Sequence, residues 1–118
     1  MTIEDIEKIL EKCWCKETSS DPDNWTEDNP SWGQCAITSL IVQDELGGEL
    51  LRALLYDSKT SHYWNKLPSE EEVDLTRKQF KIFQMSTWPI IRDREYVLSF
   101  PDTKKRYELL RKKFDEIK

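Results

Sequence analysis

The sequence contains only one histidine, three glycines and three cysteines, and it lacks any long hydrophobic run. A helix that crosses a membrane needs about 18 or more predominantly apolar residues in a row, and no stretch of this chain reaches that length. The first residues already follow the pattern of a charged amphipathic helix, so we expect no signal peptide either. These absences predict a cytoplasmic protein without a membrane partner.

The three cysteines are Cys13, Cys15 and Cys35. An odd number of cysteines in a chain without an export signal argues against a disulfide framework, so we expect reduced thiols. Together with His62, they could form a zinc site of three sulfurs and one nitrogen. Structural zinc ligands usually come in pairs roughly two to four residues apart, whereas Cys13 and Cys15 are separated by a single residue. The sequence therefore predicts no metal and no other cofactor, with zinc as a minor alternative.

Basic residues are fewer than acidic ones, so the formal net charge is −5 and the pI is near 5.0. Domains that bind nucleic acids usually present a broad basic surface, so we expect no nucleic-acid partner. The basic residues that cluster near the end of the chain are interrupted by acidic ones, as on a solvated helix face. These residues are Lys104, Lys105, Arg106, Arg111, Lys112 and Lys113.

The length of 118 residues predicts a single domain, residues 1–118. Apolar residues recur every three or four positions from Thr2 to about Trp14, which predicts an amphipathic helix, and Thr2 with Asp5 resembles a capping box. A second helix should run from about Gln34 to Leu46, where two glycines stop it. A last helix should begin after Pro101, with Asp102 or Thr103 as its N-cap. Its apolar stripe is Tyr107, Leu110, Phe114 and Ile117.

Strands are expected between these helices. Residues 49–57 favour a strand, and residues 61–67 and 71–76 favour a hairpin around Pro68. A short helical turn should follow at 76–80, then a loop around Trp88 and a short apolar stretch at 96–100. The predicted architecture is α+β, with a central helix packed on a roughly three-stranded antiparallel sheet and helices at both ends.

Cys35 is the first candidate for chemistry, because it should lie in the first turn of the second helix. The free N–H groups at a helix start carry partial positive charge. Such a position favours the nucleophilic thiolate and can lower a cysteine pKa from about 8.5 to roughly 3.5–7.5. The same position also suits a small, buried, inert side chain, so Cys35 alone does not establish a catalytic site.

His62 and Asp74 supply the groups that a cysteine nucleophile requires. A thiol needs a proton acceptor that titrates near neutral pH, and a third group should orient the imidazole. If His62 directly opposes Asp74 in the hairpin, residues 64/72 and 66/70 also pair. Opposed residues share one face of a sheet, so this register would bring the histidine and the carboxylate together.

The order Cys35, His62, Asp74 resembles the catalytic core of transglutaminase-like proteins within the papain-like thiol enzymes. The residues that carry this resemblance are "GQC" (33–35), "HYWN" (62–65) and the later aspartate. It implies that Cys35 is the nucleophile, His62 the base and Asp74 the orienting group, on a papain-like fold. From "NPSWGQCA" (29–36), "SHYWNKLP" (61–68), "VDLTRKQF" (73–80) and the last helix, the chain also resembles the YunG family of uncharacterised bacterial proteins, over roughly residues 29–118.

The oxyanion of an acyl-transfer reaction needs two hydrogen-bond donors. The Cys35 backbone N–H is one candidate. Gln34 or the indole N–H of Trp25 or Trp32 could be the second, although loop packing also explains both tryptophans. Trp64 should share a sheet face with His62 and could line the site or join the core.

The sequence thus predicts a cysteine-dependent enzyme with a Cys35–His62–Asp74 triad that acts on an amide or related acyl bond. It would be a peptidase, an amidase or a transglutaminase-like enzyme, with an amide-bearing peptide or protein as its partner. The alternative is an inactive binding module that keeps the fold and recognises a partner through the loop at residues 18–32.

Overall fold

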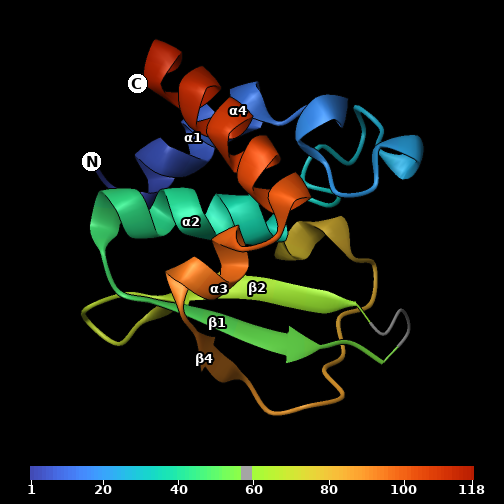
Figure 1. Ribbon diagram of the computed structural model, residues 1–118, viewed down its shortest axis with the longest axis vertical. Coiled ribbons are helices and arrows are strands. Elements are labelled where there is room, and N and C mark those ends of the chain that lie inside the picture. The colour runs from blue at the N-terminus through green and yellow to red at the C-terminus, as the bar shows by residue number, and fades with distance from the viewer. Residues whose placement is uncertain (57–59) are drawn as a thin grey trace.

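The computed structural model describes residues 1–56 and 60–118, and these residues form four α-helices and one four-stranded antiparallel sheet (Figure 1). The α-helices are α1 (Ile3–Cys13), α2 (Cys35–Leu46), α3 (Arg94–Leu98) and α4 (Pro101–Ile117). The strands are β1 (Glu49–Leu54), β2 (Ser61–Lys66), β3 (Glu72–Val73) and β4 (Ile90–Arg92). Three short 3₁₀ helices are η1 (Lys16–Thr18), η2 (Pro22–Asn24) and η3 (Arg77–Gln79). The predicted α+β class is confirmed.

Helix α1 begins where the sequence indicates. The Asp5 N–H donates to Thr2 Oγ1 at 3.2 Å, and the Thr2 N–H donates to Asp5 Oδ2 at 3.0 Å. This reciprocal capping box satisfies donors that the first turn leaves free. The apolar stripe then buries Ile6, Leu10 and Cys13.

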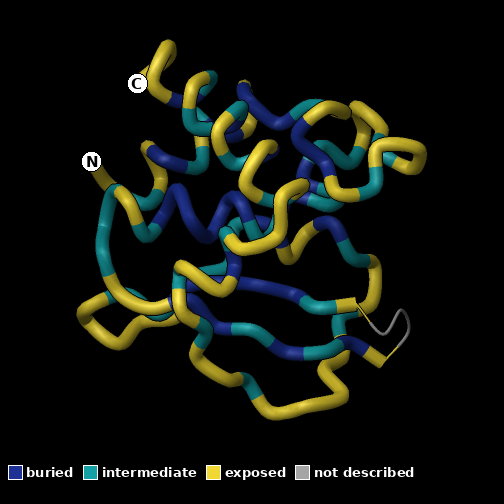
Figure 2. Tube along the Cα trace, in the orientation of Figure 1, coloured by how far each residue is buried: buried dark blue, intermediate teal, exposed yellow. Residues whose placement is uncertain are grey.

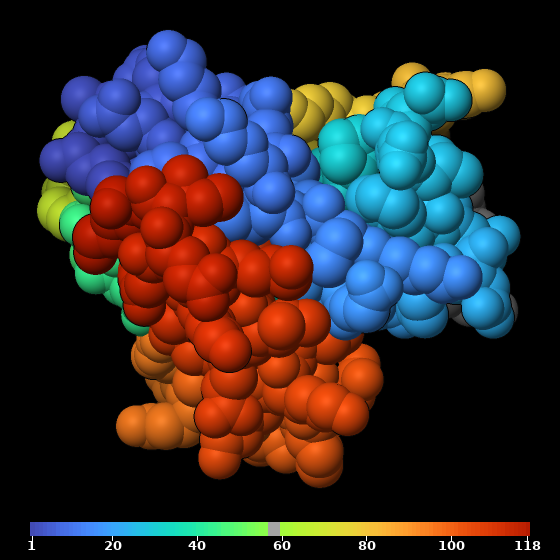
Figure 3. Space-filling view, turned by 90° about the horizontal axis from the view of Figure 1, so that it is seen from above, coloured from blue at the N-terminus to red at the C-terminus, as the bar shows by residue number. Residues whose placement is uncertain are grey.

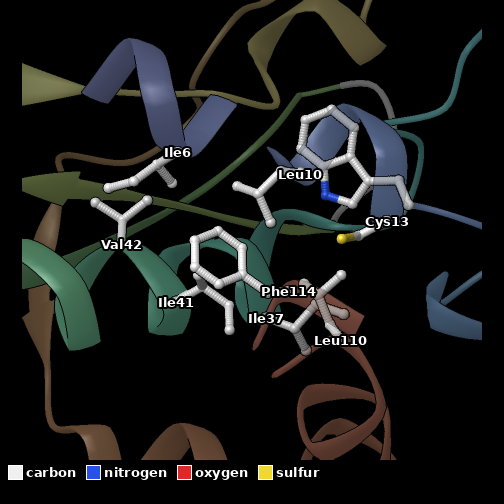
Figure 4. Close-up of a cluster of buried hydrophobic side chains, with 9 residues drawn as sticks. Ile6, Leu10, Cys13, Ile37, Ile41, Val42, Leu110 and Phe114 are labelled. Atoms are coloured by element: carbon white, nitrogen blue, oxygen red, sulfur yellow. The ribbon is translucent and has the colours of Figure 1, made fainter. Parts of the chain in front are cut away.

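The largest core cluster lies where α1, α2 and α4 meet. Helix α2 is buried from Ile37 to Val42, and Figure 2 shows it as a dark-blue stretch between the terminal helices and the sheet. Leu110 and Phe114 of α4 are fully buried in the same cluster (Figure 4). Seen from above, α1, α4 and residues 15–33 form one continuous surface (Figure 3). Among the described residues, no helix has the length and apolar character that crossing a membrane requires.

The sheet has the order β3-β2-β1-β4, so the prediction of roughly three strands was one short. The extra strand is β4, in which Ile91 pairs with Leu51 of β1. It follows Pro89, and Ile90 and Ile91 are both exposed, so alternating burial gives no signal for it. Strand β1 ends at Leu54, and residue 57 of the predicted strand lies outside the described residues.

The region near the C-terminus contains one helix that was not predicted and one helix cap that needs correction. The apolar stretch after β4 is the helix α3, packed through Val97 against Leu40 and Leu50. Helix α4 has Phe100 as its N-cap, not Asp102 or Thr103. Pro101 explains the earlier start, because proline has the backbone angle of a first helical residue and needs no N–H partner there.

The hairpin register differs from the prediction by two residues. Lys66 pairs with Glu72 and Asn65 with Val73, instead of the predicted pairs 64/72 and 66/70. The turn is longer than expected, because the Leu67 N–H donates to the Glu71 carbonyl at 2.8 Å. His62 and Asp74 are therefore not directly opposed, but a shift of two residues keeps every side chain on its face.

Candidate active site

Cys35 is the first residue of α2, and its thiol faces the start of β2. The Sγ atom lies 3.9 Å from the carbonyl oxygen of Ser61, the residue before His62. The N-cap is Gln34, which makes no side-chain capping hydrogen bond within the described chain. The helix start therefore presents its backbone N–H groups beside the thiol, as the sequence predicts.

His62 and Asp74 are hydrogen bonded. The distance between His62 Nε2 and Asp74 Oδ2 is 2.6 Å, and the histidine side chain is fully buried. The other carboxylate oxygen, Oδ1, accepts from the Thr76 backbone N–H at 3.2 Å. Arg77 Nε also donates to Oδ2, at 3.1 Å. The carboxylate is thus fixed at both oxygens and holds one edge of the imidazole.

The second ring nitrogen, His62 Nδ1, is buried and has no hydrogen-bond partner among the described residues. Burial lowers the pKa of His62, but the hydrogen bond to Asp74 and the interaction with Cys35 outweigh it and raise that pKa to about 9. Because Asp74 takes Nε2, Nδ1 is the ring nitrogen that remains without a partner among the described residues. The structure thus joins His62 to Asp74 directly and places Cys35 close enough to influence the pKa of the same ring.

Aromatic side chains surround the imidazole. Trp64 stacks on it, with ring centroids 5.8 Å apart. Phe80 and Phe83 meet it edge-on at 5.2 and 5.3 Å. The Trp64 indole N–H donates to Glu72 Oε1 at 2.8 Å, and the tryptophan is only 2% exposed. Trp64 therefore packs against His62 in the protein interior, and it is not one of the residues that line the adjacent pocket.

A pocket of about 630 Å³ opens at the thiol. Its lining includes Trp32, Gly33, Cys35, Ser61, Gln79 and Phe80. The aromatic rings of Trp32 and Phe80 contact each other edge-on, with centroids 6.2 Å apart. Cys35 is partly exposed, so a molecule in this pocket can reach the thiol, while His62 lies buried behind it.

The predicted second oxyanion donors are engaged elsewhere. The indole N–H of Trp32 donates to Asp21 Oδ2 at 3.1 Å, and that of Trp25 donates to the Pro30 carbonyl at 2.9 Å. Gln34 is fully buried, and its amide donates to the Cys15 carbonyl at 3.0 Å. Of the candidate oxyanion donors that the sequence suggested, the backbone N–H of Cys35 is therefore the one that lies beside the thiol.

Sequence reasoning missed Gln79 and Arg77. Gln79 lines the pocket and is bonded to the turn before Cys35, while Arg77 shares the carboxylate of Asp74. Both lie on η3, a short helical turn without an apolar period. The available signal was their position three and five residues after Asp74, within the segment 73–80 that resembles the YunG family.

The structure does not gather the cysteines into a metal site. Cys13 is buried in the core of the helices, whereas Cys35 lines the pocket. Across residues 1–56 and 60–118, no group of three or more His, Cys, Asp or Glu side chains could hold a metal ion.

Comparisons with known proteins identify relatives by sequence. A family model described as "YunG protein" matches residues 2–118. A protein of Bacillus subtilis (strain 168), called "Uncharacterized protein YunG", is 34% identical over 79 residues, which are 67% of this chain. The match spans 64% of that relative, a little less than two thirds of its length. No solved structure matches the chain.

Proposed function

The chain belongs to the YunG family, and we propose that it is a cysteine-dependent enzyme that hydrolyses or transfers an amide or related acyl group. The observation that carries this proposal is the 2.6 Å hydrogen bond between His62 and Asp74, made behind a thiol that lines an open pocket. A buried imidazole with one nitrogen held and the other free suits proton transfer to and from a neighbouring thiol. The core would then be papain-like or transglutaminase-like in its chemistry.

His62 would be the proton donor of the first step. The raised pKa of His62 keeps the imidazole protonated at neutral pH. An adjacent imidazolium and the start of a helix both favour the thiolate, which is the nucleophilic form of cysteine.

In the first step, the Cys35 thiolate attacks the carbonyl carbon of the substrate and forms a carbon–sulfur bond. The negative charge on the carbonyl oxygen would be stabilised by the Cys35 backbone N–H. The bond from carbon to the leaving nitrogen then breaks, while His62 gives its proton to that nitrogen. The products are a thioester on Cys35, a free amine and a neutral His62.

In the second step, neutral His62 takes a proton from water or from an incoming amine. The oxygen or nitrogen attacks the thioester, the carbon–sulfur bond breaks, and Cys35 leaves as a thiolate beside the restored imidazolium. Water gives hydrolysis and an amine gives transamidation. Asp74 keeps its hydrogen bond to the Nε2 proton of His62 throughout.

A small activated ester tests the acylation step without knowledge of the natural substrate. We expect p-nitrophenyl acetate to place one acetyl group on Cys35, detected by mass spectrometry of the intact chain and its peptides. His62→Gln should slow the reaction at about pH 7 by roughly 10²-fold or more, because the proton-transfer group is lost. Cys15→Ser is the matched control and should react like the wild type.

Acetylation of Cys15 and Cys35 at equal rates, or a rate at Cys35 that ignores His62→Gln, would contradict the proposal. The alternative of an inactive binding module would then be favoured. It predicts that Cys35→Ser retains partner binding and that no member of a broad amide panel is turned over.

A further inference from the structure

Gln79 is a buried polar residue that the proposed mechanism does not use. It lies on η3, its exposed fraction is 6%, and it lines the pocket near Cys35. The side-chain oxygen Oε1 accepts from the Gly33 N–H at 3.0 Å. The side-chain nitrogen Nε2 donates to the Thr76 carbonyl at 3.0 Å. A glutamine in this position uses both its acceptor and its donor on the backbone of two different segments.

These two segments carry the two halves of the candidate site. Gly33 is two residues before Cys35, in the turn that leads into α2. Thr76 donates its own N–H to Asp74 Oδ1 at 3.2 Å, and Asp74 bonds to His62 at 2.6 Å. A continuous path of hydrogen bonds thus joins the turn before the thiol to the imidazole, and Gln79 is its central link.

A second contact strengthens the same connection. The Asn29 side-chain amide donates to the Gln79 backbone carbonyl at 3.0 Å. Asn29 belongs to the long segment between α1 and α2, and it also lines the pocket. Without Gln79, the turn before Cys35 would retain the contact of Asn29 to η3 but would leave the partly buried Gly33 N–H without its partner, which is costly.

We propose that Gln79 is a positioning residue that fixes the separation between the Cys35 thiol and the His62–Asp74 pair. This inference rests on the proposed function for its consequence, because small displacements of reacting groups lower the rate steeply. Glutamine suits the position because leucine offers neither contact, while glutamate keeps the acceptor for Gly33 but loses the donor to Thr76.

The link itself can be tested without any activity. The chain has three glycines, so selective ¹⁵N-glycine labelling gives three backbone amide signals, from Gly33, Gly47 and Gly48. In Gln79→Leu, we expect hydrogen exchange at Gly33 to accelerate by about tenfold. Gly47 donates to the Gln43 carbonyl at 2.8 Å and should not change. Gln84→Leu, a substitution at an exposed glutamine, is the matched control and should leave all three signals as in the wild type.

The positioning role is tested by alkylation of the three thiols with iodoacetamide across a range of pH. We expect Gln79→Leu to slow the alkylation of Cys35 about tenfold near neutral pH and to change the pH dependence of its rate. Cys13 is 2% exposed and should stay unmodified unless the chain unfolds. If Gln79→Leu does expose Cys13, the experiment uses the variant Gln79→Glu instead. In that variant we expect slow hydrogen exchange at Gly33, as in the wild type, and slower alkylation of Cys35 than in the wild type.

The outcomes separate the two proposals. Unchanged Gly33 exchange in Gln79→Leu, or unchanged Cys35 alkylation in a folded Gln79 variant when His62→Gln slows it, overturns the positioning role. Cys35 alkylation that ignores His62→Gln overturns the proposed function instead, and the Gly33 result then describes only the architecture of the turn.

Discussion

At the scale of single residues, Asp74 makes two kinds of contact with its two oxygens. Oδ1 is held by Thr76, whereas Oδ2 is shared by the imidazole of His62 and by Arg77. Arg77 also stacks over Phe83, with its guanidinium carbon 4.1 Å from the ring centroid. The carboxylate therefore has a fixed direction, and its oxygen facing the imidazole requires an N–H on Nε2.

We expect Asp74→Asn to preserve the fold and to lower the acetylation rate of Cys35 by on the order of 10³-fold. The side-chain amide can donate to Nε2 and so favour the imidazole tautomer that carries its proton on Nδ1, where it cannot accept one from the thiol. The rate is measured with p-nitrophenyl acetate, and far-UV circular dichroism checks the fold. Asp23→Asn, at an exposed carboxylate, serves as the control. A rate unchanged in Asp74→Asn would leave Asp74 as a turn residue only.

His62 also links stability to pH. Its folded-state pKa of about 9 lies above the ordinary value of 6.5, so protonation stabilises the folded chain. This contribution is fully present below about pH 6.5 and is lost as the pH rises through about 9. The difference in unfolding free energy between wild type and His62→Gln should therefore fall by about 3 kcal/mol from about pH 6 to about pH 9.5. Urea titrations measure it, and a difference independent of pH would contradict the pKa shift.

The site residues differ in how far the sequence can predict them. Cys35, His62 and Asp74 could be named as candidates because their chemical types are complementary and because a hairpin offers few ways to bring two strands together. The two-residue error in register did no harm, since it preserves the face of each residue. Gln79 could not be predicted, because its proposed role depends on where the backbone of Gly33 lies. Gly33 belongs to a loop, and no periodic sequence pattern specifies the position of a loop.

At the scale of secondary-structure elements, the turn from α2 to β1 depends on two adjacent glycines. Gly47 and Gly48 have φ angles of 77° and 89°, in the region that other residues rarely adopt. A Cβ on Gly47 would meet only Pro68 at 3.6 Å, whereas a Cβ on Gly48 would lie 2.2 Å from the Lys66 carbonyl oxygen. The second position thus needs glycine for space as well as for its backbone angle.

We expect Gly48→Ala to lower the unfolding free energy by at least about 1 kcal/mol more than Gly47→Ala. Both substitutions introduce backbone strain of roughly 1–3 kcal/mol, but only Gly48→Ala also pushes β1 away from β2. Urea unfolding of the two variants gives the comparison directly. Equal losses would mean that the hairpin moves aside without cost.

Elements with a long apolar period were predictable, and so was the short turn η3, whereas β4 and α3 were not. Helices α1, α2 and α4 have 11, 12 and 17 residues, enough for a stripe to repeat, and each was anticipated. Strand β4 and helix α3 have 3 and 5 residues. An element of that length shows less than two full periods, so its conformation is set by the surface on which it packs.

At the scale of the whole molecule, α4 packs the C-terminal part of the chain against α1 and against the central helix α2. Phe114 is fully buried against α1 and α2, while Ile117, one turn later, is 45% exposed. The network of Arg111 with Asp44 and Glu45 of α2 lies beside this contact, with nitrogen–oxygen distances of 3.2 and 3.0 Å. The predicted apolar stripe of the last helix is therefore confirmed at Leu110 and Phe114, which are buried, and it ends before Ile117.

We expect Phe114→Ala to lower the unfolding free energy by about 3–5 kcal/mol, because it leaves a cavity between three helices. Ile117→Ala removes a partly exposed side chain from the same helix and should cost less than about 1 kcal/mol. Thermal and urea unfolding measure both variants. Similar losses would show that the end of α4 contributes more to the core than its exposure indicates.

The salt bridge of Lys118 with Glu45, at 3.1 Å, places the last residue at the end of α2 opposite to Cys35. Figure 1 shows the first residue on that same side. Twelve residues of helix, roughly 18 Å, separate this end of α2 from the thiol. An affinity tag, a fluorophore or a surface linker attached at either end would therefore leave the mouth of the thiol pocket facing solution, so the protein can be immobilised for ligand screening without blocking it.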